Sequence, residues 1–154
     1  LANSNHYYFK EKDKKYSLNL NGLEITREES HKILSKDLIK TANILRKNGI
    51  NLVVSSGIPY LNSSKCDQWF NKYNNKCTID WGSSKQVKVT RDVQLLAAKK
   101  GKFLLLDFYS KIEDFALENI VQNTSIYYYN EGHLNSRGVR DIISPVILES
   151  LNQL

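Results

Sequence analysis

The most informative run for the fold class is Ile50-Asn51-Leu52-Val53-Val54-Ser55-Ser56. It is short and apolar, it is rich in β-branched residues, and the turn residues Gly57-Ile58-Pro59-Tyr60 follow it, as is typical of a buried strand. A helical pattern precedes this run, and a helix that leads into a continuous apolar strand is typical of α/β proteins. We therefore expect a parallel strand that is covered on both faces.

The preceding helix is predicted from its two ends. Thr26-Arg27-Glu28-Glu29 matches a capping box, in which the Thr26 and Glu29 side chains satisfy each other's backbone N–H groups, and Asn48-Gly49 supplies a C-terminal stop. His31 lies among charged residues near the start, so we expect it to face solvent. Four apolar residues share one face of this helix: Leu34, Leu38, Ala42 and Leu45.

A second helix and strand repeat this order. Val89, Val93, Leu96 and Ala97 form a helical stripe that ends at Lys99-Lys100-Gly101, and Phe103–Asp107 is a second apolar strand. Asp107 ends that strand, where open α/β sheets bind ligands, but an aspartate there also caps the next turn, and we favour the cap. A short helix is expected over Ser110–Ile120.

The last part of the chain predicts a strand, a turn and a helix. Ser125–Tyr129 is β-branched and aromatic, Asn130–Gly132 has turn chemistry, and Ser136 can cap a helix. Pro145 predicts either a kink or a second segment with Ser144 as its cap. The apolar positions expected to face the core are Val139, Ile142, Ile143, Val146, Ile147 and Leu151.

Length and composition predict one globular domain over residues 1–154. The chain is 41% hydrophobic and 25% charged, and it has no run approaching the roughly 18 apolar residues of a membrane span. Its net charge is +6, but the lysines are scattered and no nucleic-acid motif accompanies them, so we favour a solvated basic surface over nucleic-acid binding. The chain begins at Leu1 without a signal-peptide pattern, so a targeting or membrane part could precede it.

Cys66 and Cys77 bracket a loop rich in asparagine, lysine and aromatic residues. Two cysteines without a Cys-x-x-Cys motif or a nearby histidine do not make a structural zinc site, and we expect no metal. A disulfide is the more economical interpretation, and two free buried thiols are the alternative. The aromatic residues assigned to this loop could stack on sugar rings or pack beneath it: Trp69, Phe70, Tyr73 and Trp81.

His133 stands between the last strand and the last helix, and we interpret it as a catalytic base, with a hydrogen-bonded turn histidine as the alternative. The stretch Asn130-Glu131-Gly132-His133-Leu134-Asn135-Ser136-Arg137-Gly138 resembles the last motif of the SGNH hydrolases. It is most similar to the extracytoplasmic SGNH domain fused to acyltransferase-3 membrane proteins, whose pattern is Asp-x-x-His-Leu-Ser/Asn-x-x-Gly. Asn130 stands where that family has its aspartate.

The resemblance implies a fold and further site residues. The fold would be a three-layer sandwich, a flavodoxin-like parallel sheet flanked by helices, of which this chain is the C-terminal portion, incomplete at its N-terminus. Asn3 and Asn5 would be candidates for the oxyanion hole, although either can also close a turn. The resemblance also favours the disulfide between Cys66 and Cys77, because those domains face the periplasm or the cell exterior.

The implied function is acyl transfer or ester hydrolysis on cell-surface polysaccharide, without a cofactor. His133 would be the general base, oriented by Asn130, and the domain could be tethered to an upstream acyltransferase membrane domain. The nucleophilic serine of the family lies in a Gly-Asp-Ser motif that this chain lacks, so it would precede Leu1. Ser55-Ser56-Gly57 lacks both that motif and a Gly-x-Ser-x-Gly elbow. The alternative is a non-catalytic glycan-binding or interaction domain derived from the same fold.

Overall fold

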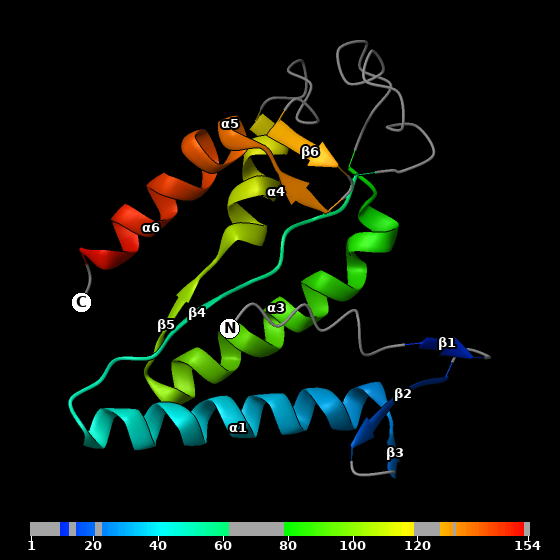
Figure 1. Cartoon of the computed structure of the whole chain (residues 1–154), viewed down its shortest axis with the longest axis vertical. Helices are drawn as coiled ribbons and strands as arrows, with labels where there is room; N and C mark the ends of the chain where they lie inside the picture. Colours follow the sequence, from blue (N-terminus) through cyan, green and yellow to red (C-terminus); the bar gives the residue numbers. More distant parts are fainter. Residues whose placement is uncertain are drawn as a thin grey trace. The chain divides into compact units, whose positions relative to one another are not determined.

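The computed structural model describes residues 10–12, 15–20, 23–61, 79–118, 127–130 and 132–152 (Figure 1). Most of this described chain is helical, and it includes a small parallel sheet of two strands, which agrees with an α/β protein. Two compact units make up the chain. The first comprises Leu1–Val54 and Asp92–Leu105, and the second comprises Ser55–Arg91 and Leu106–Leu154.

The first unit begins with an antiparallel meander of three strands, β1 (Lys10–Lys12), β2 (Lys15–Leu20) and β3 (Leu23–Ile25). Lys10 pairs with Ser17, and Leu18 pairs with Ile25. The sequence analysis did not predict these strands. The alternation of apolar and polar residues along β2 has the period of a strand and was the signal for it.

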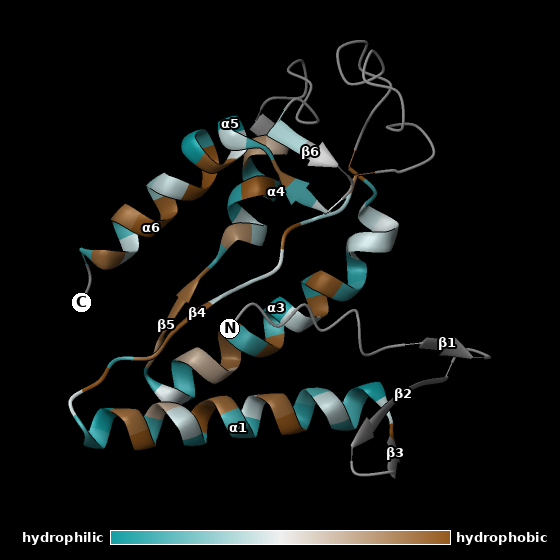
Figure 2. Cartoon of the chain, viewed as in Figure 1, coloured by the Kyte–Doolittle hydropathy of each residue, from teal (hydrophilic) through white to brown (hydrophobic). Residues whose placement is uncertain are grey.

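Helix α1 (Arg27–Lys47) begins and ends as the sequence predicts. The Glu29 N–H donates to Thr26 Oγ1 at 3.2 Å, and the Thr26 N–H donates to Glu29 Oε2 at 2.7 Å, so the capping box is confirmed. The helix stops at Asn48, and Gly49 follows with a φ of 72°, which only glycine adopts without strain. Ala42 is buried on the predicted apolar face, and the ribbon alternates between hydrophobic and hydrophilic bands in Figure 2.

The two predicted apolar runs pair as parallel strands, β4 (Val53–Ser55) and β5 (Leu104–Leu106). The Leu104 N–H donates to the Leu52 carbonyl at 3.1 Å, and the Ser56 N–H donates to the Leu106 carbonyl at 3.0 Å. Both partners advance along the chain in the same direction, which defines a parallel pair. Both strands are shorter than expected, and Val53 is 41% exposed, so the expectation that β4 is covered on both faces was wrong.

Helix α3 (Trp81–Gly101) is longer than its apolar stripe indicated. Its start is fixed by Asp80, whose carboxylate accepts from the Ser83 N–H at 3.0 Å, so Trp81 belongs to the helix and not to the preceding loop. Of the predicted stripe, Ala97 is fully buried but Leu96 is 58% exposed. Sequence periodicity alone therefore misplaced part of the buried face of this helix.

Helix α4 (Phe108–Glu118) starts directly after β5. Asp107 caps it, because its carboxylate accepts from the Ser110 N–H at 3.2 Å, which confirms the favoured interpretation of Asp107. The Tyr109 N–H, in the first turn of α4, has no helix carbonyl four residues before it and donates instead to the Ser56 hydroxyl at 3.0 Å. A serine at the end of β4 therefore completes the cap of a helix that follows β5.

The chain ends with a hairpin, β6 (Tyr128–Asn130) and β7 (His133–Leu134), and with the helical segments α5 (Ser136–Gly138), η4 (Val139–Ile143) and α6 (Ser144–Leu151). The cap of α5 is Asn135, not the expected Ser136, because the Gly138 N–H donates to Asn135 Oδ1 at 3.0 Å. The π-helical turn η4 precedes Pro145, so a second segment begins there, as one alternative predicted. Ser144 does not cap it, because its hydroxyl donates to the Val139 carbonyl.

The core of the second unit lies between α4, the hairpin and the C-terminal helical segments. Its buried members are Leu61, Ile112, Tyr127, Tyr128, Ile142 and Ile143. Among the positions of the last helix predicted to face the core, the prediction is wrong for Val139 and Leu151, because their exposed fractions are 46% and 51%. None of the helices in the described ranges is both long enough and apolar enough to cross a membrane.

Candidate active site

The β6–β7 hairpin brings the two predicted site residues together. Asn130 pairs with His133 across the antiparallel strands, and Tyr128 pairs with Leu134. The register is irregular between Tyr128 and Asn130, next to the turn. The backbone thus places Asn130 directly opposite His133, so the Asn130 position can influence the histidine across one strand pair.

The motif around His133 consists largely of residues that build this hairpin. Leu134 packs against the core, and Asn135 donates its own N–H to the Tyr127 carbonyl at 2.9 Å while capping α5. Gly138 leaves no room for a Cβ, which would collide with the Tyr127 carbonyl and lie 3.1 Å from Leu134. His133 differs from these residues because its side chain is exposed.

The hairpin contacts the loop that follows β4. The Tyr128 hydroxyl donates to the Pro59 carbonyl at 2.9 Å, and a Cβ added at Gly132 would lie 3.3 Å from the Tyr60 ring. Burial raises the pKa of Tyr128 far above its ordinary range, so its hydroxyl remains a neutral donor. The hairpin that carries His133 therefore lies against the loop that follows β4. Open α/β sheets bind ligands at the C-terminal ends of their strands.

The loop after β4 is in turn held by the start of α3. The Tyr60 N–H donates to the Ser84 hydroxyl at 2.8 Å, and the Asp80 N–H donates to the Tyr60 carbonyl at 2.7 Å. Ser84 is fully buried, and its hydroxyl donates to the Asp80 carbonyl at 2.6 Å. A β-bridge between Leu61 and Ile79 joins the two ends of segment 62–78. Every backbone polar group of Tyr60 is thus paired.

A charged cluster lies where β5 ends. Arg91 Nε donates to Asp107 Oδ2 at 2.8 Å, and the Arg91 guanidinium also donates to the Ser110 hydroxyl at 2.7 Å. Burial by itself would raise the pKa of Asp107, but the hydrogen bonds from Arg91 and Ser110 and the Arg91 charge lower the pKa below its ordinary value. These contacts make Asp107 a structural cap and ion-pair partner.

Ser56 has the environment of a structural residue. It is 5% exposed, and its hydroxyl donates to the Gly57 carbonyl at 3.1 Å while accepting from the Tyr109 N–H. A nucleophilic serine needs an accessible hydroxyl within hydrogen-bond reach of a base. The contacts of Ser56 instead hold α4 against the end of β4.

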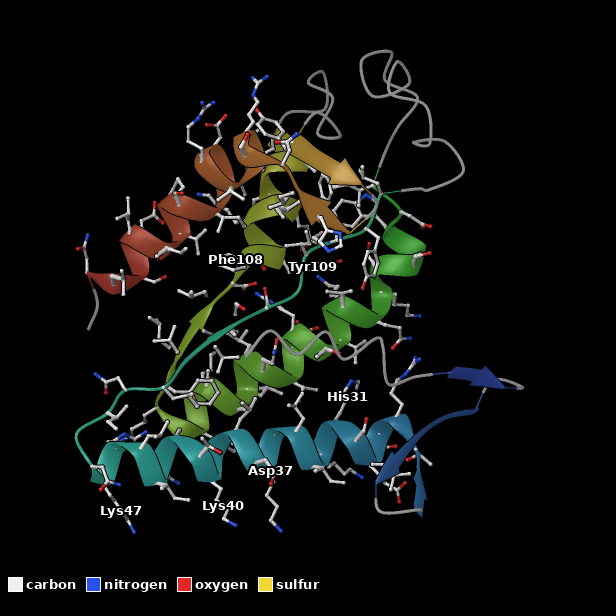
Figure 3. The ribbon with its side chains drawn as sticks, viewed as in Figure 1. His31, Asp37, Lys40, Lys47, Phe108 and Tyr109 are labelled. Carbon is white, nitrogen blue, oxygen red and sulfur yellow. The ribbon has the colours of Figure 1, made fainter. Side chains whose placement is uncertain are left out.

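His31 is half-buried, so it faces solvent only in part. Figure 3 shows it on the opposite side of α1 from Lys40 and Lys47. Burial, reinforced by the Arg27 charge, lowers the pKa of His31, which favours the neutral imidazole. His31 belongs to the first unit, whereas the hairpin that carries His133 belongs to the second.

Four predicted site residues lie outside the described residues: Asn3, Asn5, Cys66 and Cys77. Glu131 also lies outside them. Within the described residues, no group of three or more histidine, cysteine, aspartate and glutamate side chains could hold a metal ion. The sequence interpretation missed the supporting roles of Tyr60 and Ser84. Their only sequence signal was the Asp80-Trp81-Gly82-Ser83 cap that starts α3 nearby.

No protein-family model, no curated protein and no solved structure matches this chain. The functional assignment therefore depends on the hairpin geometry and on the sequence motif around His133.

Proposed function

We propose that this chain is the histidine-bearing portion of an SGNH-type domain that transfers or hydrolyses acyl esters on cell-surface polysaccharide. The observation that carries the proposal is the exposed His133, paired with Asn130 in a hairpin that contacts the loop at the C-terminal end of β4. The small parallel sheet with its adjoining helices would be part of the larger three-layer sandwich of that family.

The reaction follows from the role of each group. A serine hydroxyl supplied by sequence before Leu1 attacks the acyl carbonyl, and His133 accepts the hydroxyl proton. Asn3 or Asn5 would donate a hydrogen bond to the oxyanion of the tetrahedral intermediate. As the intermediate collapses, His133 returns the proton to the leaving alcohol and the acyl group stays on the serine. Water then releases the acid, or a sugar hydroxyl takes the acyl group, with His133 again the base.

Asn130 favours a second candidate function, a non-catalytic glycan-binding domain on the same fold. An asparagine carbonyl can orient an imidazole, but it carries no charge to stabilise the imidazolium that forms when His133 accepts a proton. Glycan binding that is unchanged in His133→Ala, without ester turnover, would favour this second function.

The proposed location is the extracytoplasmic face of a membrane, with an upstream acyltransferase domain as a partner. In that oxidising compartment Cys66 and Cys77 would form a disulfide. Mass spectrometry after thiol alkylation of the native protein tests this. Protection of both cysteines until a reductant is added supports the proposal, and immediate alkylation of both contradicts it.

Kinetics of the full-length protein test the catalytic assignment. His133→Ala should reduce kcat/KM for an acetyl ester by about a thousandfold or more, because the general base is lost. His31→Ala is the matched control, since it removes a histidine of the other unit. Equal activity of the His133 variant and the unaltered protein would exclude His133 as the base.

A further inference from the structure

The Tyr60 ring lies directly against the turn that precedes His133. A Cβ built on Gly132 would be 3.3 Å from Tyr60 Cε1 and 3.5 Å from Tyr60 Cδ1. The ring edge therefore occupies the space into which a side chain at the residue before the histidine would project. Gly132 permits this close approach because it has no side chain.

The backbone that carries this ring is fixed on both sides. The Tyr60 N–H donates to Ser84, and the Tyr60 carbonyl accepts from the Asp80 N–H. On one side Leu61 forms a β-bridge with Ile79, and on the other the Pro59 carbonyl accepts from the Tyr128 hydroxyl. A ring on an anchored backbone is a rigid support, because its position does not depend on a mobile loop.

We propose that Tyr60 is a positioning residue whose ring sets the place of the Gly132 turn and thereby of the His133 imidazole. The inference rests on the proposed function of His133. A general base must lie within about 3.2 Å of the proton that it removes, and a displacement of about 1 Å can cost a hundredfold in rate. Support from Tyr60 would therefore act on kcat more than on substrate binding.

Two substitutions at Tyr60 distinguish the contribution of its ring from that of its hydroxyl. In the full-length protein, Tyr60→Ala should lower kcat by about 10- to 100-fold with KM within about twofold, whereas Tyr60→Phe retains the ring and should stay near the original kcat. Phe103→Ala is the matched control, because Phe103 is also half-buried and its ring also lies against a glycine, Gly101, but in the other unit.

A second readout does not depend on activity. The ring 1H–13C signals of the histidines in this chain report their surroundings directly, and His133→Ala assigns the signal of His133. Tyr60→Ala should move that signal, whereas Phe103→Ala should leave it in place. An unmoved His133 signal in folded Tyr60→Ala would overturn the inference. A signal that moves further than the lost ring current of Tyr60 accounts for, in a protein without esterase or transferase activity, would sustain it while refuting the proposed function.

Gly132→Ala probes the same contact from the other side. Its Cβ must push the Tyr60 ring by a few tenths of an ångström, so it should move the His133 signal by itself, and it should move it less when Tyr60 is already alanine. Equal effects in both backgrounds would show that the Tyr60 ring does not support the turn. If Tyr60→Ala fails to fold, an unmoved signal in Gly132→Ala also overturns the inference.

Discussion

Asn130 and His133 pair across the β6–β7 hairpin, so the residue that the resemblance aligns with the SGNH aspartate lies directly opposite the histidine. A short antiparallel pair fixes the separation of the two backbones, so the interaction between the two positions depends on which side chains they carry.

Asn130→Asp should increase the esterase or transferase activity of the full-length protein, by about tenfold or more. A carboxylate at this position can stabilise the imidazolium that forms when His133 accepts the serine proton. Steady-state kinetics at neutral pH measure the change. A loss of activity would instead indicate that the neutral amide is the better partner for His133.

Ser56→Ala should destabilise the protein by about 1–3 kcal/mol, because the buried Tyr109 N–H loses the hydroxyl that accepts its hydrogen bond. Urea unfolding followed by circular dichroism measures the free energy of unfolding. Ser55→Ala is the control, since Ser55 is exposed, and it should change stability by less than about 0.5 kcal/mol. Equal effects of the two variants would contradict the capping role of Ser56.

The Asp107–Arg91 pair should make the free energy of unfolding decrease as the pH falls into the acid range. The folded-state pKa of Asp107 lies below its ordinary value of 3.8, so the ionised carboxylate stabilises the fold at higher pH. This contribution is lost as the pH falls from about 4 through the folded-state pKa. Between pH 5 and pH 2, the urea concentration at the unfolding midpoint should therefore decrease less in Asp107→Asn than in the unaltered protein. An identical acid dependence in the variant would contradict the assignment.

Lys102 adopts a left-handed conformation, with a φ of 49°, directly after α3. Lys102→Gly should stabilise the protein by up to about 1 kcal/mol, because glycine adopts this conformation without strain. Lys100→Gly is the matched control inside the helix, and it should destabilise by about 1 kcal/mol. Thermal unfolding compares the two, and a lower midpoint for Lys102→Gly would show that the conformation is not strained.

The sequence analysis correctly predicted features that depend on residues close together in the chain. The Thr26 capping box, the Asn48-Gly49 stop and the Asp107 cap each involve residues within a few positions of one another. The two parallel strands were also predictable, because continuous apolar runs between helical patterns have few other interpretations.

Features that depend on distant contacts were not predictable in the same way. The Ser56 hydroxyl caps α4 from 53 residues away, and Tyr60 meets Gly132 through an even longer separation in the chain. The cap at Asn135 was misplaced by one residue because Ser136 is an equally good capping type. Of the site, the sequence predicted that Asn130 and His133 act together but not which loop lies against their hairpin.

Labelling of the full-length protein with a fluorophosphonate probe tests the central claim most directly, because such probes react with serine hydroxyls that a histidine activates. We expect one serine before Leu1 to be labelled, located by peptide mass spectrometry, and the labelling to be lost in His133→Ala but retained in His31→Ala. Labelling that is absent from the unaltered protein, or that is unaffected by His133→Ala, would contradict the assignment of His133 as the general base.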